Sequence, residues 1–214
     1  MSKTLIIVGM GPGLSMGLAQ KFGAEGFRIG MISRNAEKLK GFQEELKAQG
    51  ISSDYTTADV ANTQSLLSAL DALSAKMGRV DVVNYNAVDA RFVPLLEEKI
   101  EDLTKGFTLS VGNALAAVRH LLPQLKASKG AVLLTGGGSA NYPNPNMASI
   151  SLGKAGIRNL AYQLHQVCKK EEVYVGTLTI NGWIQWESET HSPKILGEKF
   201  WELYQKRDKV EMEY

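Results

Sequence analysis

Cysteine is scarce in this sequence: Cys168 is the only one among 214 residues. One thiol excludes an internal disulfide, and its place in a helix-like segment predicts a reduced, structural thiol. No run of about 18 apolar residues occurs, which argues against a membrane-spanning segment. A net charge of only +2 provides no concentrated basic face, so we expect no nucleic-acid partner.

From the sequence we also expect no targeting segment and no linker between domains. The chain enters a strand-like run within a few residues, which leaves no room for a signal peptide and predicts a cytoplasmic protein. No repeat, low-complexity linker or shift in composition divides the chain. We therefore expect one domain over residues 1–214, and no metal site.

Short apolar runs alternate with longer stretches of helical periodicity, which is typical of β-α units around a parallel sheet. Strands are expected at 4–10, 27–33, 52–60, 80–87, 130–138 and 173–180. Helices are expected at 14–26, 36–50, 62–78, 101–128 and 146–172. Pro123 should kink or end the fourth helix. The tail, 192–214, predicts a short helix capped by Ser192 and a candidate edge strand. The predicted fold class is α/β, a Rossmann-type doubly wound parallel sheet of six to seven strands flanked by helices.

The stretch GMGPGLSMG, residues 9–17, follows the first expected strand and opens a helix. Gly9 suits the tight turn, while Gly11 and Gly13 allow backbone amides to approach a pyrophosphate at the helix N-terminus. This context predicts a dinucleotide-binding loop. Two alternatives stay open: a turn rich in glycine for packing, and a loop that holds S-adenosylmethionine.

The second expected strand ends in ISRN, where Ser33 and Arg34 stand and no carboxylate occurs before Glu37. An arginine here suits the 2′-phosphate of NADP(H), because its fork pairs with the phosphate oxygens. We therefore expect NADP(H) in preference to NAD(H), and either one in preference to a methyl donor. The alternative for Arg34 is a solvated surface cation.

With these features in view, the chain resembles the short-chain dehydrogenase/reductase family from about residue 3 to residue 185. The residues that carry the resemblance are Gly9 and Gly13 of a TGxxxGxG-like loop, Asp59 and Val60 of an adenine-binding pair, Asn86 and Ala87 of an NNAG-like segment, Lys154 of a YxxxK-like motif and Gly182 after the sixth strand. The resemblance implies hydride transfer between a nicotinamide cofactor and a carbonyl or alcohol. It also implies a homodimer or homotetramer formed by the two long helices.

Three of the family's four catalytic positions have changed. Ser110 stands at the position of the asparagine, Gly137 at that of the serine and Ile150 at that of the tyrosine, while Lys154 is retained. Ser15 also replaces the third glycine of the loop. In the family the tyrosine exchanges the proton and the lysine holds the nicotinamide ribose. A member with Ile150 therefore needs a non-standard proton donor.

Possible replacements lie nearby in the sequence. Ser151 precedes Lys154 by three residues and shares nearly the same helix face, so it could pass a proton from Lys154 or from water. Ser139 could hydrogen-bond a carbonyl. Tyr85 and Tyr142 could reach the cleft, although packing is the simpler explanation for both. For His191 a solvated role is expected.

Trp183 and Trp186 follow the sixth strand, where they either cover the nicotinamide or an apolar substrate or anchor the tail helix. Three functions therefore remain. The first is an NADP(H)-dependent oxidoreductase that acts on a small molecule through Lys154, Ser151 and Ser139. The second is a non-catalytic NADP(H)-binding sensor, and the third is a methyltransferase.

Overall fold

The computed structural model describes residues 2–214, and its sheet has seven strands in the order β3-β2-β1-β4-β5-β6-β7. The strands are β1 (Thr4–Val8), β2 (Arg28–Ser33), β3 (Ser53–Thr57), β4 (Val82–Tyr85), β5 (Ala131–Thr135), β6 (Tyr174–Thr179) and β7 (Glu211–Glu213). Every neighbouring pair is parallel. The strand order reverses between β1 and β4, which is where ligands bind in sheets of this kind. The predicted fold class is confirmed.

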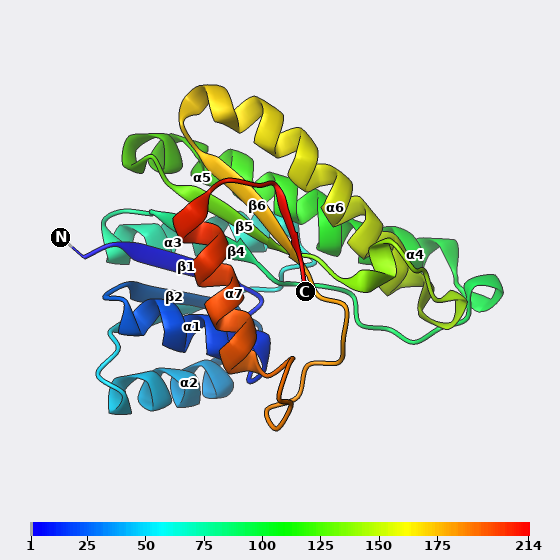
Figure 1. Ribbon diagram of the computed structural model, residues 1–214, viewed down its shortest axis with the longest axis horizontal. Helices are drawn as coiled ribbons and strands as arrows, with labels where there is room; N and C mark the ends of the chain where they lie inside the picture. Colours follow the sequence, from blue (N-terminus) through cyan, green and yellow to red (C-terminus); the bar gives the residue numbers. More distant parts are fainter. Residues whose placement is uncertain (1) are drawn as a thin grey trace.

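Helices cover both faces of this sheet (Figure 1). They are α1 (Leu14–Ala24), α2 (Ala36–Ala48), α3 (Thr63–Met77), α4 (Ile100–Phe107), α5 (Asn113–Ser128), α6 (Ala148–Cys168) and α7 (Pro193–Lys206). Ile6 and Val8 belong to one apolar core with residues of α3, α5 and α6. Leu5 and Ile7 belong to a second core with residues of α1, α2 and α7. Because both faces of the central strands are buried, these strands are largely apolar in the sequence, whereas the edge strands β3 and β7 are polar and less buried.

Several predicted boundaries were wrong. The first strand ends at Val8 rather than at residue 10, because Gly9 turns away with φ +92°. The third strand covers Ser53–Thr57 rather than 52–60, so Asp59 and Val60 lie in the loop that follows it. The helix expected over 146–172 is α6 flanked by short 3-10 turns.

The predicted helix over 101–128 consists of α4, a π-helical turn at Thr108–Gly112 and α5. Pro123 does not end α5, which continues to Ser128. Leu121 and Leu125, on either side of the proline, are fully buried. Their packing against the sheet stabilises the last turns of the helix and offsets the hydrogen bond that proline cannot donate.

The tail forms α7 and β7, and β7 pairs with β6 at the edge of the sheet. Along residues 2–214 we find no helix with the length and apolar character needed to cross a membrane. The same residues contain no group of three or more histidine, cysteine or acidic side chains placed to hold a metal ion.

Candidate functional site

The loops that follow the central strands meet at one edge of the sheet. Val8 pairs with Ile32 on one side and with Tyr85 on the other, and Tyr85 pairs with Leu134. The last residues of β1, β2, β4 and β5 therefore lie nearly level, and the segments after them gather at this carboxyl edge. The segment between β6 and α7 lies below the same edge in Figure 1.

The glycine loop has the geometry of an anion cradle. A Cβ atom on Gly9 would lie 2.7 Å from the amide nitrogen of Ala87, so only glycine fits this turn. At Gly11 and Gly13 a Cβ would meet nothing within 4 Å, and no side chain caps the N-terminus of α1. Space is thus open beside both glycines, and no side chain binds the first amides of the helix. Such amides bind a diphosphate well, since the helix dipole favours negative charge there.

Ser15, in place of the third glycine, has a structural role in this loop. Its Oγ donates a hydrogen bond to the carbonyl of Gly9 (2.9 Å) and accepts one from Asn86 Nδ2 (2.7 Å). Asn86 Nδ2 also donates to the Gly9 carbonyl at 3.2 Å. The serine and the asparagine therefore hold the glycine turn against the end of β4.

The residues expected to hold the adenosine half lie after β2 and β3. Arg34 is exposed beside the end of β2, and Ser33 is half-buried. The carboxylate of Asp59 accepts a hydrogen bond from the amide of Ala61, which fixes the loop after β3. Val60 is buried at the same point of the chain. The structure thus places all four residues at the carboxyl edge, on the β2–β3 side of the glycine loop.

Asn113 also belongs to this region, and its contacts were not predicted from the sequence. The buried side chain of Asn113, at the start of α5, donates to the carbonyl of Val60 (2.7 Å) and accepts from Thr63 Oγ1 (2.7 Å). It therefore ties the loop after β3 to α3 and α5. No spacing rule in the sequence predicts this contact, because the partners are 50 and 53 residues away.

Lys154 reaches the carboxyl end of β5. Its Nζ donates to the carbonyl oxygen of Thr135 at 2.7 Å. The stem packs on Gly137, where a Cβ would lie 3.4 Å from Cγ, Cδ and Cε of the lysine. Burial lowers the pKa of Lys154 to about 8, since the charged form loses hydration. The half-buried Ile150 lies one turn earlier on α6 and provides no polar atom.

Ser139 and Ser151 both line a cavity of about 370 Å³, whose lining does not include Lys154. Ser151 Oγ accepts a hydrogen bond from the amide of Asn144 (3.1 Å) and donates to its carbonyl (3.4 Å). Its hydroxyl thus holds the loop between β5 and α6. The cavity is lined mainly by apolar side chains: Leu95, Ser139, Ala140, Pro143, Asn144, Pro145, Ala148, Ser151, Leu152 and Ala155.

The two tyrosines differ in accessibility. Tyr85 is buried, its hydroxyl donates to the carbonyl of Leu109, and burial raises its pKa. It is a packed core residue with no route to a ligand. Tyr142 is 78% exposed in the loop between β5 and α6. His191 is half-buried rather than solvated, because its ring packs against Gly182 and lies 5.3 Å from the ring of Tyr214.

A charged cluster beside Ile150 was missed in the sequence. Asp89 Oδ2 accepts hydrogen bonds from Ser149 Oγ (2.6 Å) and Arg91 Nε (2.8 Å). Arg91 also donates to the buried carboxylate of Glu98 at 2.9 Å. The amide of Asp89 donates to Ser110 Oγ in the π-helical turn (3.2 Å). The cluster therefore fixes the residue before Ile150 to the loop after β4. The run VDARF, which places two charges after a buried strand, was the available signal.

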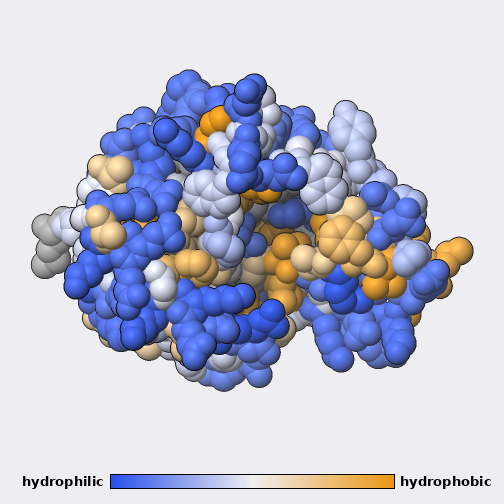
Figure 2. All heavy atoms as spheres, turned by 90° about the horizontal axis from the view of Figure 1, so that it is seen from below, coloured by the Kyte–Doolittle hydropathy of each residue, from blue (hydrophilic) through white to orange (hydrophobic). Residues whose placement is uncertain are grey.

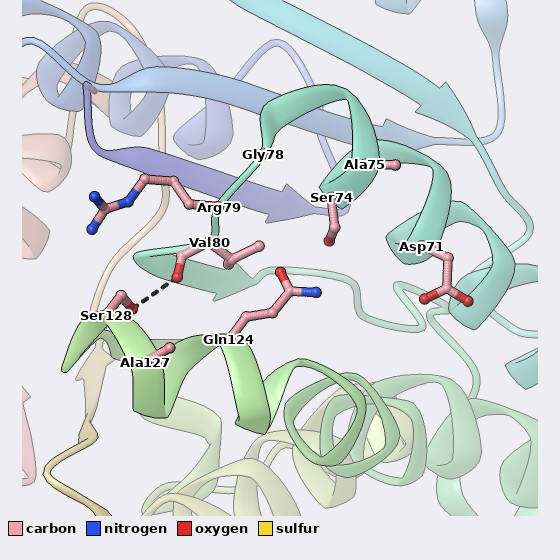
Figure 3. A pocket seen from close by; sticks show the side chains of 9 residues that line it. All are labelled: Asp71, Ser74, Ala75, Gly78, Arg79, Val80, Gln124, Ala127 and Ser128. Atoms are coloured by element: carbon pink, nitrogen blue, oxygen red, sulfur yellow. Dashed lines mark hydrogen bonds between the residues drawn. The ribbon is translucent and has the colours of Figure 1, made fainter.

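A larger cavity, of about 530 Å³, lies elsewhere. Figure 3 shows it between α3 and α5, with Ser74 from the first helix and Gln124 from the second. Ser128 Oγ donates to the carbonyl of Val80 at its end (2.8 Å). Val80 precedes β4, so this cavity lies at the amino edge of the sheet, away from the glycine loop and Lys154.

The surface of the molecule is also hollowed on another face. Figure 2 views the molecule from below, where a hollow with hydrophobic side chains lies near the middle of the face.

Comparisons with known proteins agree with this arrangement. A family model described as short chain dehydrogenase matches residues 3–183. The chain is 28% identical over 168 residues to a 12alpha-hydroxysteroid dehydrogenase of Clostridium sp., covering 74% of this chain and 64% of that protein. It is 29% identical over 135 residues to a diacetyl reductase ((S)-acetoin forming) of Staphylococcus epidermidis, covering 62% of this chain and 52% of that protein. The chain thus spans between half and two thirds of the length of these relatives.

Solved structures show the same fold. A short-chain dehydrogenase from Rhodopseudomonas palustris superposes with a TM-score of 0.86 at 23% identity, over 99% of this chain and 97% of that one. An actinorhodin polyketide ketoreductase with NADPH superposes with a TM-score of 0.90 at 18% identity, over 99% and 95%. At these identities the likeness concerns the fold alone.

Proposed function

Because the chain belongs to the short chain dehydrogenase family, we propose that it is an oxidoreductase for a small carbonyl or alcohol substrate, with NADP(H) preferred over NAD(H). The observation that carries the proposal is the placement of Lys154 Nζ at the end of β5, at the same edge of the sheet as the open glycine loop. Bound NADPH would supply the hydride. The amides at the start of α1 hold the diphosphate, and Arg34 pairs with the 2′-phosphate.

Lys154 holds the proton in this proposal. Ile150 has no acidic hydrogen, and the Ser151 hydroxyl is hydrogen-bonded to the backbone of Asn144. A pKa of about 8 leaves the Lys154 ammonium protonated at neutral pH but acidic enough to release the proton. In reduction, Nζ transfers its proton to the carbonyl oxygen while the carbonyl carbon receives the hydride. Solvent then returns a proton to Nζ.

In this proposal the substrate lies in the apolar cavity, whose lining includes Ala155, the residue that follows Lys154 in the sequence. Ser139 and Ser151 line this cavity together with side chains such as Leu95 and Leu152. Its volume of about 370 Å³ suits a small, largely apolar molecule. In this proposal Ser139 offers a hydrogen bond to the substrate, and Ser151 shapes the cavity wall through its bonds to Asn144.

A second function is favoured by the changed catalytic positions. With Ser110 bound to the amide of Asp89 and Ile150 apolar, the protein could bind NADP(H) without turnover and act as a sensor. Reduction of any carbonyl compound by NADPH, at a rate dependent on Lys154, decides against the sensor. Methyl transfer, the third hypothesis, has no support from the family to which the chain belongs.

We also propose a homodimer or homotetramer formed through α5 and α6. Both helices carry partly exposed apolar side chains, among them Leu115, Leu152, Tyr162 and Val167. Association through these helices would bury such side chains, which is favourable because exposed apolar area costs free energy. Static light scattering measures the assembly.

The cofactor assignment is tested by titrating the protein with NADPH and NADH and following energy transfer from tryptophan to the dihydronicotinamide. We expect NADPH to bind at least about tenfold more tightly, and Arg34→Ala to weaken NADPH while leaving NADH unchanged. Lys40→Ala, an exposed lysine on α2, is the control for a general loss of positive charge. Failure of both nucleotides to bind would overturn the proposed function.

A further inference from the structure

Trp186 connects the segment after β6 to the glycine loop. Its indole Nε1 donates a hydrogen bond to the carbonyl oxygen of Pro12 at 3.0 Å, across 174 residues of sequence. Pro12 stands between Gly11 and Gly13, where added Cβ atoms would meet nothing. The indole therefore contacts the loop between the two glycines that have open space beside them. Trp186 is still 46% exposed, so the contact is made at the surface.

Both ends of this segment are anchored. At the first end the amide of Asn181 donates to the carbonyl of Tyr214 (2.7 Å), and the amide of Tyr214 donates to the carbonyl of Thr179 (2.9 Å). A Cβ on Gly182 would lie 2.8 Å from the ring of His191. The start of the segment is thus packed against its own end.

The second end is closed by a turn. Ser188 Oγ accepts the amide hydrogens of His191 (2.9 Å) and Thr190 (3.4 Å), and the amide of Ser188 donates to the carbonyl of Gln185 (3.1 Å). Between these anchors, the bond from Trp186 to Pro12 holds the middle of the segment against the glycine loop.

We propose that Trp186 is a cofactor-binding residue whose indole covers the diphosphate held by the glycine loop and slows its release. This inference rests on the proposed function, because it requires a dinucleotide in that loop. The apolar indole covers the charged phosphate groups, and its hydrogen bond to Pro12 holds it in this covering position. The cofactor then leaves only after the indole swings away.

Trp183 provides a matched control within the same segment. Its side chain is 73% exposed, against 46% for Trp186, and it makes none of the hydrogen bonds found among residues 2–214. Trp183→Phe removes the same atoms as Trp186→Phe and leaves the contact with Pro12 in place. Comparison of the two variants separates the effect of this contact from the general loss of an indole.

The experiment measures NADPH binding to the full chain by calorimetry and NADPH dissociation by stopped flow. For Trp186→Phe we expect dissociation to accelerate about tenfold with little change in the association rate, whereas Trp183→Phe stays within about twofold of the parent. Unfolding temperatures close to that of the parent show that both variants fold.

The outcomes distinguish this inference from the proposed function. If all three proteins bind NADPH with equal dissociation rates, the role of Trp186 is wrong and the proposed function stands. If Trp186→Phe binds NADPH more tightly, the indole obstructs the loop rather than covering the cofactor, which also overturns the inference. If none of the proteins binds NADPH, both fail.

Discussion

Lys154 carries its charge on a half-buried side chain, and loss of hydration there lowers its pKa. Burial lowers that pKa to about 8, whereas an exposed lysine titrates at about 10.4. The folded state therefore binds fewer protons than the unfolded state between these two values, and stability rises with pH across this window. Below about pH 8 the charged lysine is present in both states, and its burial costs stability in full.

Lys154→Met should therefore stabilise the protein at pH 7, because it keeps the stem on Gly137 and removes the buried charge. We expect the unfolding temperature to rise by a few degrees at pH 7 and the gain to shrink towards about pH 10. The same variant should lose reductase activity by about 10²–10⁴-fold, the usual contribution of a general acid. Calorimetric scans and NADPH oxidation at several pH values measure both effects.

Lys40→Met, on the exposed face of α2, serves as the control and should change neither quantity. An unfolding temperature for Lys154→Met that is lower at pH 7, or a gain independent of pH, would contradict the assignment of a buried charge. Retained activity would show that another group supplies the proton.

At the scale of elements, the close crossing of α1 and α7 depends on glycine. A Cβ on Gly17 would lie 2.0 Å from the carbonyl oxygen of Pro193, and one on Gly197 would lie 2.5 Å from the carbonyl oxygen of Gly17. The backbones of the two helices are thus in direct contact. This contact holds the tail helix beside the helix that begins at the glycine loop.

Gly17→Ala should destabilise the protein by about 1–3 kcal/mol, the usual cost of overpacking, despite alanine's higher helix propensity. Gly41→Ala is the matched control, because Gly41 lies inside α2 with nothing within 4 Å of an added Cβ. There we expect a gain of about 0.5–1 kcal/mol from helix propensity alone. Urea unfolding of the two variants measures both signs, and equal effects would contradict the crossing geometry.

At the scale of the whole molecule, β7 forms one edge of the sheet and anchors the segment after β6. Glu211 on this strand accepts hydrogen bonds from Arg158 (2.9 Å) and Tyr162 (2.9 Å) of α6 and from Thr179 (2.6 Å) of β6. Burial alone would raise the pKa of Glu211, but these donors outweigh it and lower the pKa below its ordinary value. The carboxylate thus joins the edge strand to the rest of the fold.

Glu211→Gln should destabilise the protein by about 1–3 kcal/mol at pH 7, since it weakens charge-assisted hydrogen bonds. A lowered pKa in the folded state gives stability above about pH 4.3 that is lost as pH falls through the folded value. The difference from the parent should therefore vanish in acid. Glu213 is exposed on the same strand, so Glu213→Gln is the control. We expect this variant to have the stability of the parent at every pH. A pH-independent loss in thermal unfolding would contradict this account.

Sequence patterns predicted the larger part of the fold, whereas the site residues that they named remain predictions. Apolar runs located five of the strands, because buried parallel strands have no polar face, whereas β3 has the polar sequence SDYTT and is only partly buried. The glycine loop and Lys154 were predicted to be site residues from spacing and from the family resemblance. The π-helical turn before Asn113 and the continuation of α5 past Pro123 were not predicted, because each depends on packing with α3, α6 and the sheet.

By itself the sequence determined the β-α order, the place of the glycine loop, the family resemblance and the absence of a hydroxyl at Ile150, because these follow from periodicity and residue type. Only the tertiary structure decided that the Ser151 hydroxyl binds Asn144, that Ser15 and Asn86 brace Gly9, and that Trp186 reaches Pro12. The bond from Asn86 to Ser15 spans 71 positions of sequence, and the bond from Trp186 to Pro12 spans 174. Contacts of that range are set by how helices and loops pack on the sheet, and no local pattern encodes them.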